Sequence, residues 1–298
     1  MIENILLAVS GSGNAEEMLK TLMELPSLQR TKITVLHVVP PQTTAETMTL
    51  KWEEGGKILA NTIQSLRLNP TLISSVLRQG EPKDVVGQVA QEIDADLVIM
   101  GSRGLKRLQS ILANSVSQYV FQLSSRPMLL VKDDIYVKRI KRVMVAIDGS
   151  EAAKNCLRLG LFFLKDVQNT VELILVNINT EWLGKKSEDA PDVKPESNPA
   201  LAEAAAIARK YGVEPRCILS NGGEGQQGYL TSTGRLGQEI CRLASDWNAD
   251  ILLMGSPDRR PSIAKSFVDL DRLFGSSLSD YVRVNASCPV LLARTSSD

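Results

Sequence analysis

The sequence predicts an α/β fold in which one module, a parallel sheet covered by helices, occurs twice. Its 298 residues are enough for two domains of about 150 residues each. Short apolar runs alternate with amphipathic stretches in each half, as strands and helices do in layered α/β domains. We place the boundary near residue 136, which gives domains 1–135 and 136–298. Three blocks recur in the same order: Asn4–Ser12 with Arg142–Ser150, Ala95–Ser102 with Ala249–Ser256, and Arg126–Val131 with Cys288–Ala293.

The expected strands of the first half are apolar runs rich in Val, Ile and Leu. Runs with so few polar residues fit strands buried on both faces of a parallel sheet. Between them, 14–25 and 82–93 place apolar side chains on one helical face. Pro82 suits the first turn of the second of these helices. The strands are expected at 4–10, 32–39, 72–78, 96–101 and 127–131.

Composition and charge exclude several classes of protein. The chain is 43% hydrophobic and 23% charged, as a globular protein is. Its 34 basic and 34 acidic residues cancel, so we expect no nucleic-acid partner that depends on bulk charge. The first residues lack a basic segment and a long apolar stretch, so we expect no signal peptide. No apolar run reaches the roughly 20 residues of a membrane helix, so we expect a cytoplasmic protein with no membrane partner.

The cysteines and the histidine favour structural roles. All four cysteines lie in the second half without a CxxC spacing, which favours small core residues in a reducing cytosol over a metal or redox site. The single histidine, His37, rules out a multi-histidine metal site within one chain. His37 lies in an apolar run, and its counterpart in the second half is Asn177. We expect His37 to make structural hydrogen bonds within a strand, at a position that tolerates a neutral polar residue.

The second half carries extra sequence in three places. Residues 181–199 are polar and rich in proline, so we expect a mobile loop. Residues 220–233 are rich in glycine and contain a GxGxxG spacing, which we interpret as an inserted loop rather than a dinucleotide fingerprint. Residues 257–271 lengthen the loop that follows the fourth strand.

Two loops of each half are expected beyond the carboxyl ends of the strands, where ligands bind in open parallel sheets. One follows the first strand, at Ser10 or Asp148, and the other follows the fourth, at Gly101 or Gly255. The second loop leads toward a helix expected near Asn114 or Gly275. Glycines and a free helix N-terminus suit a phosphate group. Ordinary strand-to-helix turns with a capping residue give the same spacing, and no Walker A motif occurs.

Several sequence blocks together resemble those of a known family. They are the Ala-Ile-Asp-Gly-Ser end of the strand at 142–150, the Leu-His-Val strand, Gly80-Glu81-Pro82, the block from Ala95 to Gly104, and Ser125–Leu130. The chain resembles the universal stress protein family in its tandem form. The resemblance implies Rossmann-like domains of the adenine nucleotide alpha hydrolase-like type, each with a five-stranded parallel sheet and helices on both faces. It also implies ATP as the ligand, with or without Mg, pairing of the two domains, and protein partners; a homodimer is also open.

The family pattern G-x2-G-x9-G-[ST] is carried over residue by residue. The first half keeps Gly101 and Gly104, but it has Asn114 at the third glycine and Ser10 in place of an aspartate. Asn114 is a mild change because asparagine caps helices well. The residues expected at the first nucleotide site are Val9, Ser10, Val38, Met100, Gly101, Arg103, Gly104, Asn114, Ser115 and Val116.

The second half has the opposite pattern. It keeps Asp148 and Gly255, but Asp258 places a negative charge where phosphates would bind, and the long loop delays Gly275. We therefore expect the first half to be the better nucleotide site. The second candidate site comprises Asp148, Ile178, Met254, Gly255, Asp258, Gly275, Ser276 and Ser277.

The expected function is an ATP-binding stress-response or signalling module. The alternative is a tandem scaffold that acts through protein partners, or through a different small ligand in the second half. An enzyme is not expected beyond slow ATP hydrolysis, because the site loops offer no paired carboxylates, nucleophile–base pair or metal cluster.

Overall fold

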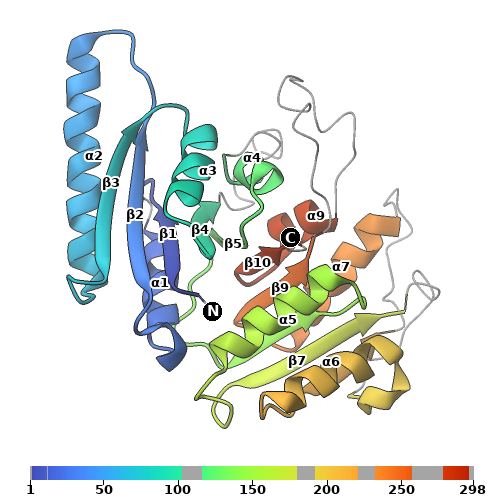
Figure 1. Ribbon diagram of the computed structural model, residues 1–298. Coiled ribbons are helices and arrows are strands. Elements are labelled where there is room, and N and C mark those ends of the chain that lie inside the picture. Colours follow the sequence, from blue (N-terminus) through green and yellow to red (C-terminus); the bar gives the residue numbers. More distant parts are fainter. Residues whose placement is uncertain are drawn as a thin grey trace. The chain divides into compact units, whose positions relative to one another are not determined.

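The computed structural model describes residues 2–11, 13–102, 116–179, 192–220, 232–256 and 278–294. The chain divides into two compact units, Met1–Lys138 and Arg139–Asp298. Each unit is an α/β domain with helices packed on a parallel sheet (Figure 1). Within the described residues, no helix combines the length and the apolar character needed to cross a membrane.

The first unit has a parallel sheet of order β3-β2-β1-β4-β5. Helices α1 (Asn14–Met23) and α2 (Ala45–Leu66) contact each other on one side, and α3 (Pro82–Glu92) and α4 (Val116–Leu123) contact each other on the other. A short 3-10 helix, η1 (Pro26–Leu28), follows α1. The strands are β1 (Asn4–Ala8), β2 (Lys32–Val39), β3 (Ile73–Gln79), β4 (Leu97–Ser102) and β5 (Met128–Lys132).

The second unit repeats this plan with the parallel order β10-β9-β6-β7-β8. Its helices are α5 (Glu151–Phe163), α6 (Pro199–Lys210), α7 (Ser232–Asp246) and α9 (Leu278–Asn285), with the 3-10 helix η4 (Pro195–Ser197) before α6. Its strands are β6 (Arg142–Ala146), β7 (Glu172–Ile178), β8 (Arg216–Ser220), β9 (Ile251–Gly255) and β10 (Val290–Ala293).

The central strands confirm the expected burial, but β3 does not. The side chains of Ile5, Leu6 and Leu7 in β1 are fully buried, as the apolar run predicts. In β3, by contrast, four of seven residues are exposed. The expectation of burial on both faces is wrong there; among the described strands, β3 pairs with β2 alone and forms the edge of its sheet.

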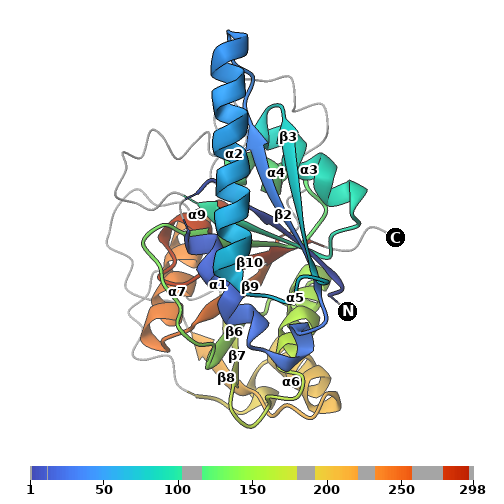
Figure 2. The same ribbon diagram turned by 90° about the vertical axis from the view of Figure 1, so that its left-hand side faces the viewer.

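Helix α2 is an element that the sequence analysis did not anticipate. Its first residues, Ala45–Glu54, are exposed apart from Met48, and the helix extends beyond the sheet (Figure 2). It approaches the sheet through Gly55, where a Cβ would lie 2.9 Å from both His37 Cδ2 and Leu77 Cδ1. Only a residue without a side chain permits this approach, so the local apolar pattern is weak and the helix is hard to recognise.

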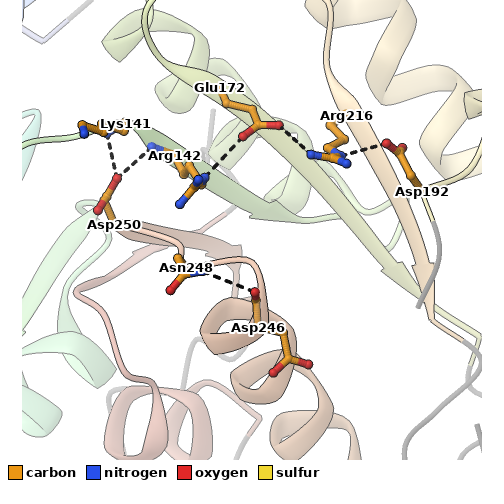
Figure 3. Close-up of polar contacts among 8 residues, drawn as sticks. All are labelled: Lys141, Arg142, Glu172, Asp192, Arg216, Asp246, Asn248 and Asp250. Atoms are coloured by element: carbon orange, nitrogen blue, oxygen red, sulfur yellow. Dashed lines mark hydrogen bonds and ion pairs between the residues drawn. The ribbon is translucent and has the colours of Figure 1, made fainter. Parts of the chain in front are cut away.

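The amino edge of each sheet is fastened by one aspartate. The Asp96 carboxylate accepts the backbone N–H groups of Glu3 and Asn4 at 2.7 and 2.9 Å. The Asp250 carboxylate accepts those of Lys141 and Arg142 at 2.7 and 2.8 Å (Figure 3). In each unit, an equivalent aspartate therefore joins the start of the first strand to the start of the fourth.

The end of the predicted mobile loop is ordered, so that prediction is wrong for residues 192–199. Asp192 forms an antiparallel bridge with Ile218 at the outer edge of β8. Arg216 binds Asp192 at 2.8 Å (Figure 3) and lies 4.5 Å from the ring of Trp247. Asn198 then caps α6 by accepting two backbone N–H groups. These contacts order the segment despite its polar composition.

Candidate functional site

The chain direction along the sheet changes at the first strand of each unit. In the first unit the chain moves outward from β1 to β2 and β3, and then continues on the other side with β4. The carboxyl ends of β1 and β4 are therefore adjacent, and Ala8 pairs with Met100. Such a point leaves an opening beyond the strand ends where a ligand can bind.

A cavity of about 100 Å³ lies at this point in the second unit. Its walls are mostly apolar, and no cationic side chain is among the residues that line it. Among the described residues that line it, Asp148 is the one charged group. The ends of the strands contribute Ile147, Asp148, Asn177, Ile178, Met254 and Gly255.

Hydrogen bonds fix the polar residues of this cavity. The Asn177 side chain donates to Ile147 O at 2.6 Å and accepts from Asn198 Nδ2 at 3.1 Å. The Asp148 carboxylate accepts the Ser150 N–H at 2.9 Å, and Ser150 in turn caps α5. Asp148 itself is exposed, so its carboxylate is open to a ligand while its position is held by the turn.

The first unit brings its described site residues to the equivalent place. Val9, Val38 and Met100 are buried at the ends of neighbouring strands, and Ser10 is exposed beside them. The ring Nδ1 of His37 lies 2.9 Å from Val9 O, as Asn177 Nδ2 lies 2.6 Å from Ile147 O. The expectation that His37 makes a structural hydrogen bond is confirmed, and the Asn177 side chain makes the equivalent bond in the second unit.

Backbone conformation or close packing explains why glycine occupies several positions around the two sites. Gly11 and Gly149 follow the first strands with φ of 86° and 82°, a conformation that favours glycine. At Gly255, a Cβ would lie 2.5 Å from Ala153 N and 2.6 Å from Ala152 C. The close approach of α5 thus requires glycine at this position whether or not a phosphate binds.

Some predicted site residues lie outside the described residues. They are Arg103, Gly104, Asn114 and Ser115 in the first half, and Asp258, Gly275, Ser276 and Ser277 in the second. The loop insertion 257–271 and most of 220–233 lie outside as well. Val116 begins α4 and is 40% exposed. Gly101 lies in β4 opposite Val131 of β5.

Both units contain buried titratable groups. Burial raises the pKa of Glu16, on α1, above its ordinary value, against hydrogen bonds that include one from Thr62. Burial also acts to raise the pKa of Glu239, on α7, but hydrogen bonds from Arg242 and Ser220 bring it below its ordinary value overall. Burial raises the pKa of the Cys156 thiol to about 12 and that of Cys217 to about 11.

The four cysteines form no disulfide with one another; three of them are buried and Cys241 is partly exposed, as expected of small core residues. Among the described residues, no group of three or more His, Cys, Asp or Glu side chains could hold a metal ion.

The family model for the universal stress protein family matches residues 1–132 and again residues 139–294. The chain belongs to the universal stress protein family. Universal stress protein YxiE of Bacillus subtilis (strain 168) is 28% identical over 148 residues, which cover 44% of this chain and 100% of that relative.

Two crystal structures are similar along most of the chain and show the fold alone. A universal stress protein from Archaeoglobus fulgidus DSM 4304 has a TM-score of 0.69 at 22% identity, covering 98% of this chain and 96% of its own. A functionally unknown protein from Pseudomonas aeruginosa PAO1 has a TM-score of 0.55 at 13% identity, covering 98% of this chain and 92% of its own. The fold of both units is thus shared with these two solved chains.

Sequence analysis missed the helical side of the cavity in this member of the family. Leu236 and Ile240 of α7 and Leu278 of α9 line it opposite the strand ends. Leu236 and Ile240 are four residues apart, which places them on one helical face. That spacing is a usable signal, but it is the same spacing that any core-facing helix shows.

Proposed function

We propose that this universal stress protein binds adenine nucleotides at the carboxyl edges of its sheets, and that occupancy changes a surface that protein partners recognise. The observation that carries the proposal is the apolar cavity of the second unit, open beside the Asp148 carboxylate. An apolar pocket with few polar groups suits a flat base, and a carboxylate suits the hydroxyl groups of a ribose.

The two units are proposed to differ in their demand for phosphate. The described lining of the second cavity has a carboxylate and no cationic side chain, which favours a nucleoside over a triphosphate. In the first unit the family pattern keeps Gly101 and Gly104, and Arg103 adds positive charge. We therefore propose the first unit as the ATP site, with or without Mg. Hydrolysis is at most slow, and four free thiols favour a cytoplasmic location.

Calorimetric titration of the nucleotide-stripped full chain tests this assignment. Mg-ATP is expected to bind at one strong site that Gly104→Asp abolishes. Adenosine is expected to bind at a second site that Asp148→Ala weakens about tenfold, because a charged hydrogen bond contributes about 1.5 kcal/mol or more. An ATP site that survives Gly104→Asp would move it to the second unit. No heat with either ligand would contradict nucleotide binding.

A scaffold that acts through protein partners is the second candidate. The exposed start of α2 favours it, because Leu50 is 64% and Trp52 is 42% exposed. Pull-down with the full chain and with Trp52→Ala would test it, with Tyr211→Ala, at an exposed position of the second unit, as the control. Loss of the same partners from both variants would contradict a role for α2.

A further inference from the structure

We infer that Glu239 is a positioning residue that holds the α7 wall of the second cavity and so sets which base the cavity accepts. The choice of base rests on the proposed function. The positioning of α7 does not, because it follows from contacts within the protein.

Glu239 lies within the stretch of α7 that forms the wall. Leu236 and Ile240 face the cavity, and Glu239 is the residue before Ile240. Its side chain is only 3% exposed. A buried carboxylate in this stretch is costly unless it is hydrogen-bonded and paired, so its contacts decide what it does there.

The carboxylate joins α7 to a strand end behind the cavity. Glu239 Oε1 accepts the Ser220 hydroxyl at 2.5 Å, and Ser220, the last residue of β8, is fully buried. Ser220 is paired in register with the cavity residue Ile178, and its carbonyl accepts the Asn179 N–H at 2.8 Å. The bond therefore fixes the distance between the helical wall and the β7 wall of the same cavity.

The charge of Glu239 is compensated by Arg242 on the same helix. Arg242 donates to both carboxylate oxygens, at 2.6 and 2.9 Å, and also to Asp246 at 2.6 Å. The carboxylate of Glu239 is buried, whereas the Arg242 side chain is 38% exposed, so Arg242 compensates a buried charge while it stays in contact with solvent. With the bond from Ser220, these contacts give the carboxylate one fixed position.

The first unit has an apolar residue where the second has Glu239. The strand pairing of Ile178 with Ser220 corresponds to that of Val38 with Arg78. When Gly80 is aligned with Gly234, Val85 is the residue equivalent to Glu239. Val85 is buried, so apolar packing holds the equivalent wall. Of the two equivalent positions, only the one in the second unit has the buried polar link.

A second contact fixes the same stretch of α7 from the other side. A Cβ at Gly237 would lie 2.5 Å from Tyr281 Cδ1 on α9. The backbone of α7 is therefore in direct contact with a ring on α9, while Glu239 attaches it to β8. Between these contacts, Leu236 and Ile240 have little freedom to move.

The test compares Ser220→Ala, Glu239→Val and the double variant in the full chain. The control is Asp246→Asn, which changes the other partner of Arg242 and leaves the Ser220–Glu239 bond intact. Adenosine and guanosine affinities are measured by calorimetry, and hydrogen exchange is measured at the amides of residues 236–240 in the unliganded protein.

Each single variant is expected to weaken adenosine binding about tenfold, in line with one lost hydrogen bond to a charged group. The ratio of adenosine to guanosine affinity should fall, the exchange at 236–240 should quicken, and the double variant should be no worse than Glu239→Val. Glu239→Gln, which keeps an acceptor for Ser220, should restore part of the affinity. Asp246→Asn should change none of these.

Unchanged exchange at 236–240 in both single variants would overturn the inference, whatever the ligand. Unchanged adenosine affinity and base ratio in both would overturn it as well. If the wild-type chain binds neither nucleoside, the proposed function of the second unit fails, and the exchange measurement alone decides whether Glu239 positions α7.

Discussion

The helices that cover one side of each sheet contact each other in two different ways. In the first unit, the exposed side chain of Lys83 on α3 places its ammonium 5.1 Å from the centroid of the Tyr119 ring on α4. In the second unit, Gly237 occupies the equivalent position and the Tyr281 ring lies against the helix backbone. A long side chain can adjust to a moving partner, but a backbone contact cannot. We therefore expect the wall over the site of the second unit to adjust less readily than that of the first.

At the amino ends of the strands the two units are alike, and substitutions there are expected to change stability the most. Asp96→Ala and Asp250→Ala each remove a carboxylate that accepts two backbone N–H groups. Each is expected to lower the free energy of unfolding of its unit by about 3 kcal/mol. Urea denaturation with hydrogen exchange at both sheets measures this. Clearly unequal losses would show that the amino edges are not equivalent.

The contrast between the helix pairs predicts the next effect. Gly237→Ala forces the Tyr281 ring to shift, and overpacking of this kind costs about 1 to 3 kcal/mol, partly offset by the better helix propensity of alanine. Lys83→Ala removes a cation–π contact worth about 0.5 to 1 kcal/mol at an exposed site. Thermal unfolding compares the two variants. A Gly237→Ala protein as stable as wild type would mean that the second wall is as adjustable as the first.

A smaller effect is expected at α1, where the units also differ. Asn14 donates to Lys132 O, and Asn155 makes the equivalent bond to Arg294 O. If Asn14 and Asn155 are aligned on this basis, the buried Glu16 of the first unit corresponds to the buried Leu157 of the second. Burial raises the pKa of Glu16, so folding favours its neutral form. The stability should therefore be highest below the ordinary value of 4.5 and should fall as the pH rises through the raised pKa.

Glu16→Gln removes this titration and should stabilise the first unit by about 1 kcal/mol at neutral pH. Below pH 4 the variant and the wild type should be equally stable, and denaturation across this pH range measures both. A gain that persists at low pH would assign the effect to packing rather than to ionisation.

The smallest effect concerns α2, whose counterpart α6 contains no glycine. Gly56→Ala should stabilise the protein by about 0.5 kcal/mol or slightly more, because a Cβ at Gly56 meets nothing within 4 Å. Gly55→Ala is the neighbouring control and should destabilise it, since its Cβ would press on His37 and Leu77. If both variants shift the melting temperature in the same direction, the packing of α2 on the sheet does not depend on the close approach at Gly55.

The sequence predicts the core of this fold well because strand runs such as Leu97–Met100 bury on both faces in any parallel sheet. The tandem repeat and the hydrogen bond of His37 could also be expected. Helix α2 could not, since Gly55 replaces an apolar residue at its contact with the sheet. Ile240 could be placed on the apolar face of a helix but not at a cavity.

Glu239 shows a further limit of sequence reasoning. Its burial depends on Ser220 and Arg242, and only the folded chain brings Ser220 to it. In the linear sequence, a glutamate three residues before an arginine is an ordinary solvated pair on a helix surface.

The Asp96 and Asp250 contacts have a consequence for how such a protein can change. They secure the amino ends of the strands in each sheet. In the second unit the cavity lies at the other end of the strands, beyond their carboxyl ends. Substitutions around a ligand can therefore accumulate without touching the contacts that start the sheet. In a duplicated chain built in this way, the loops beyond the carboxyl ends of the strands could be exchanged in either half while the aspartate contacts at the amino ends are kept.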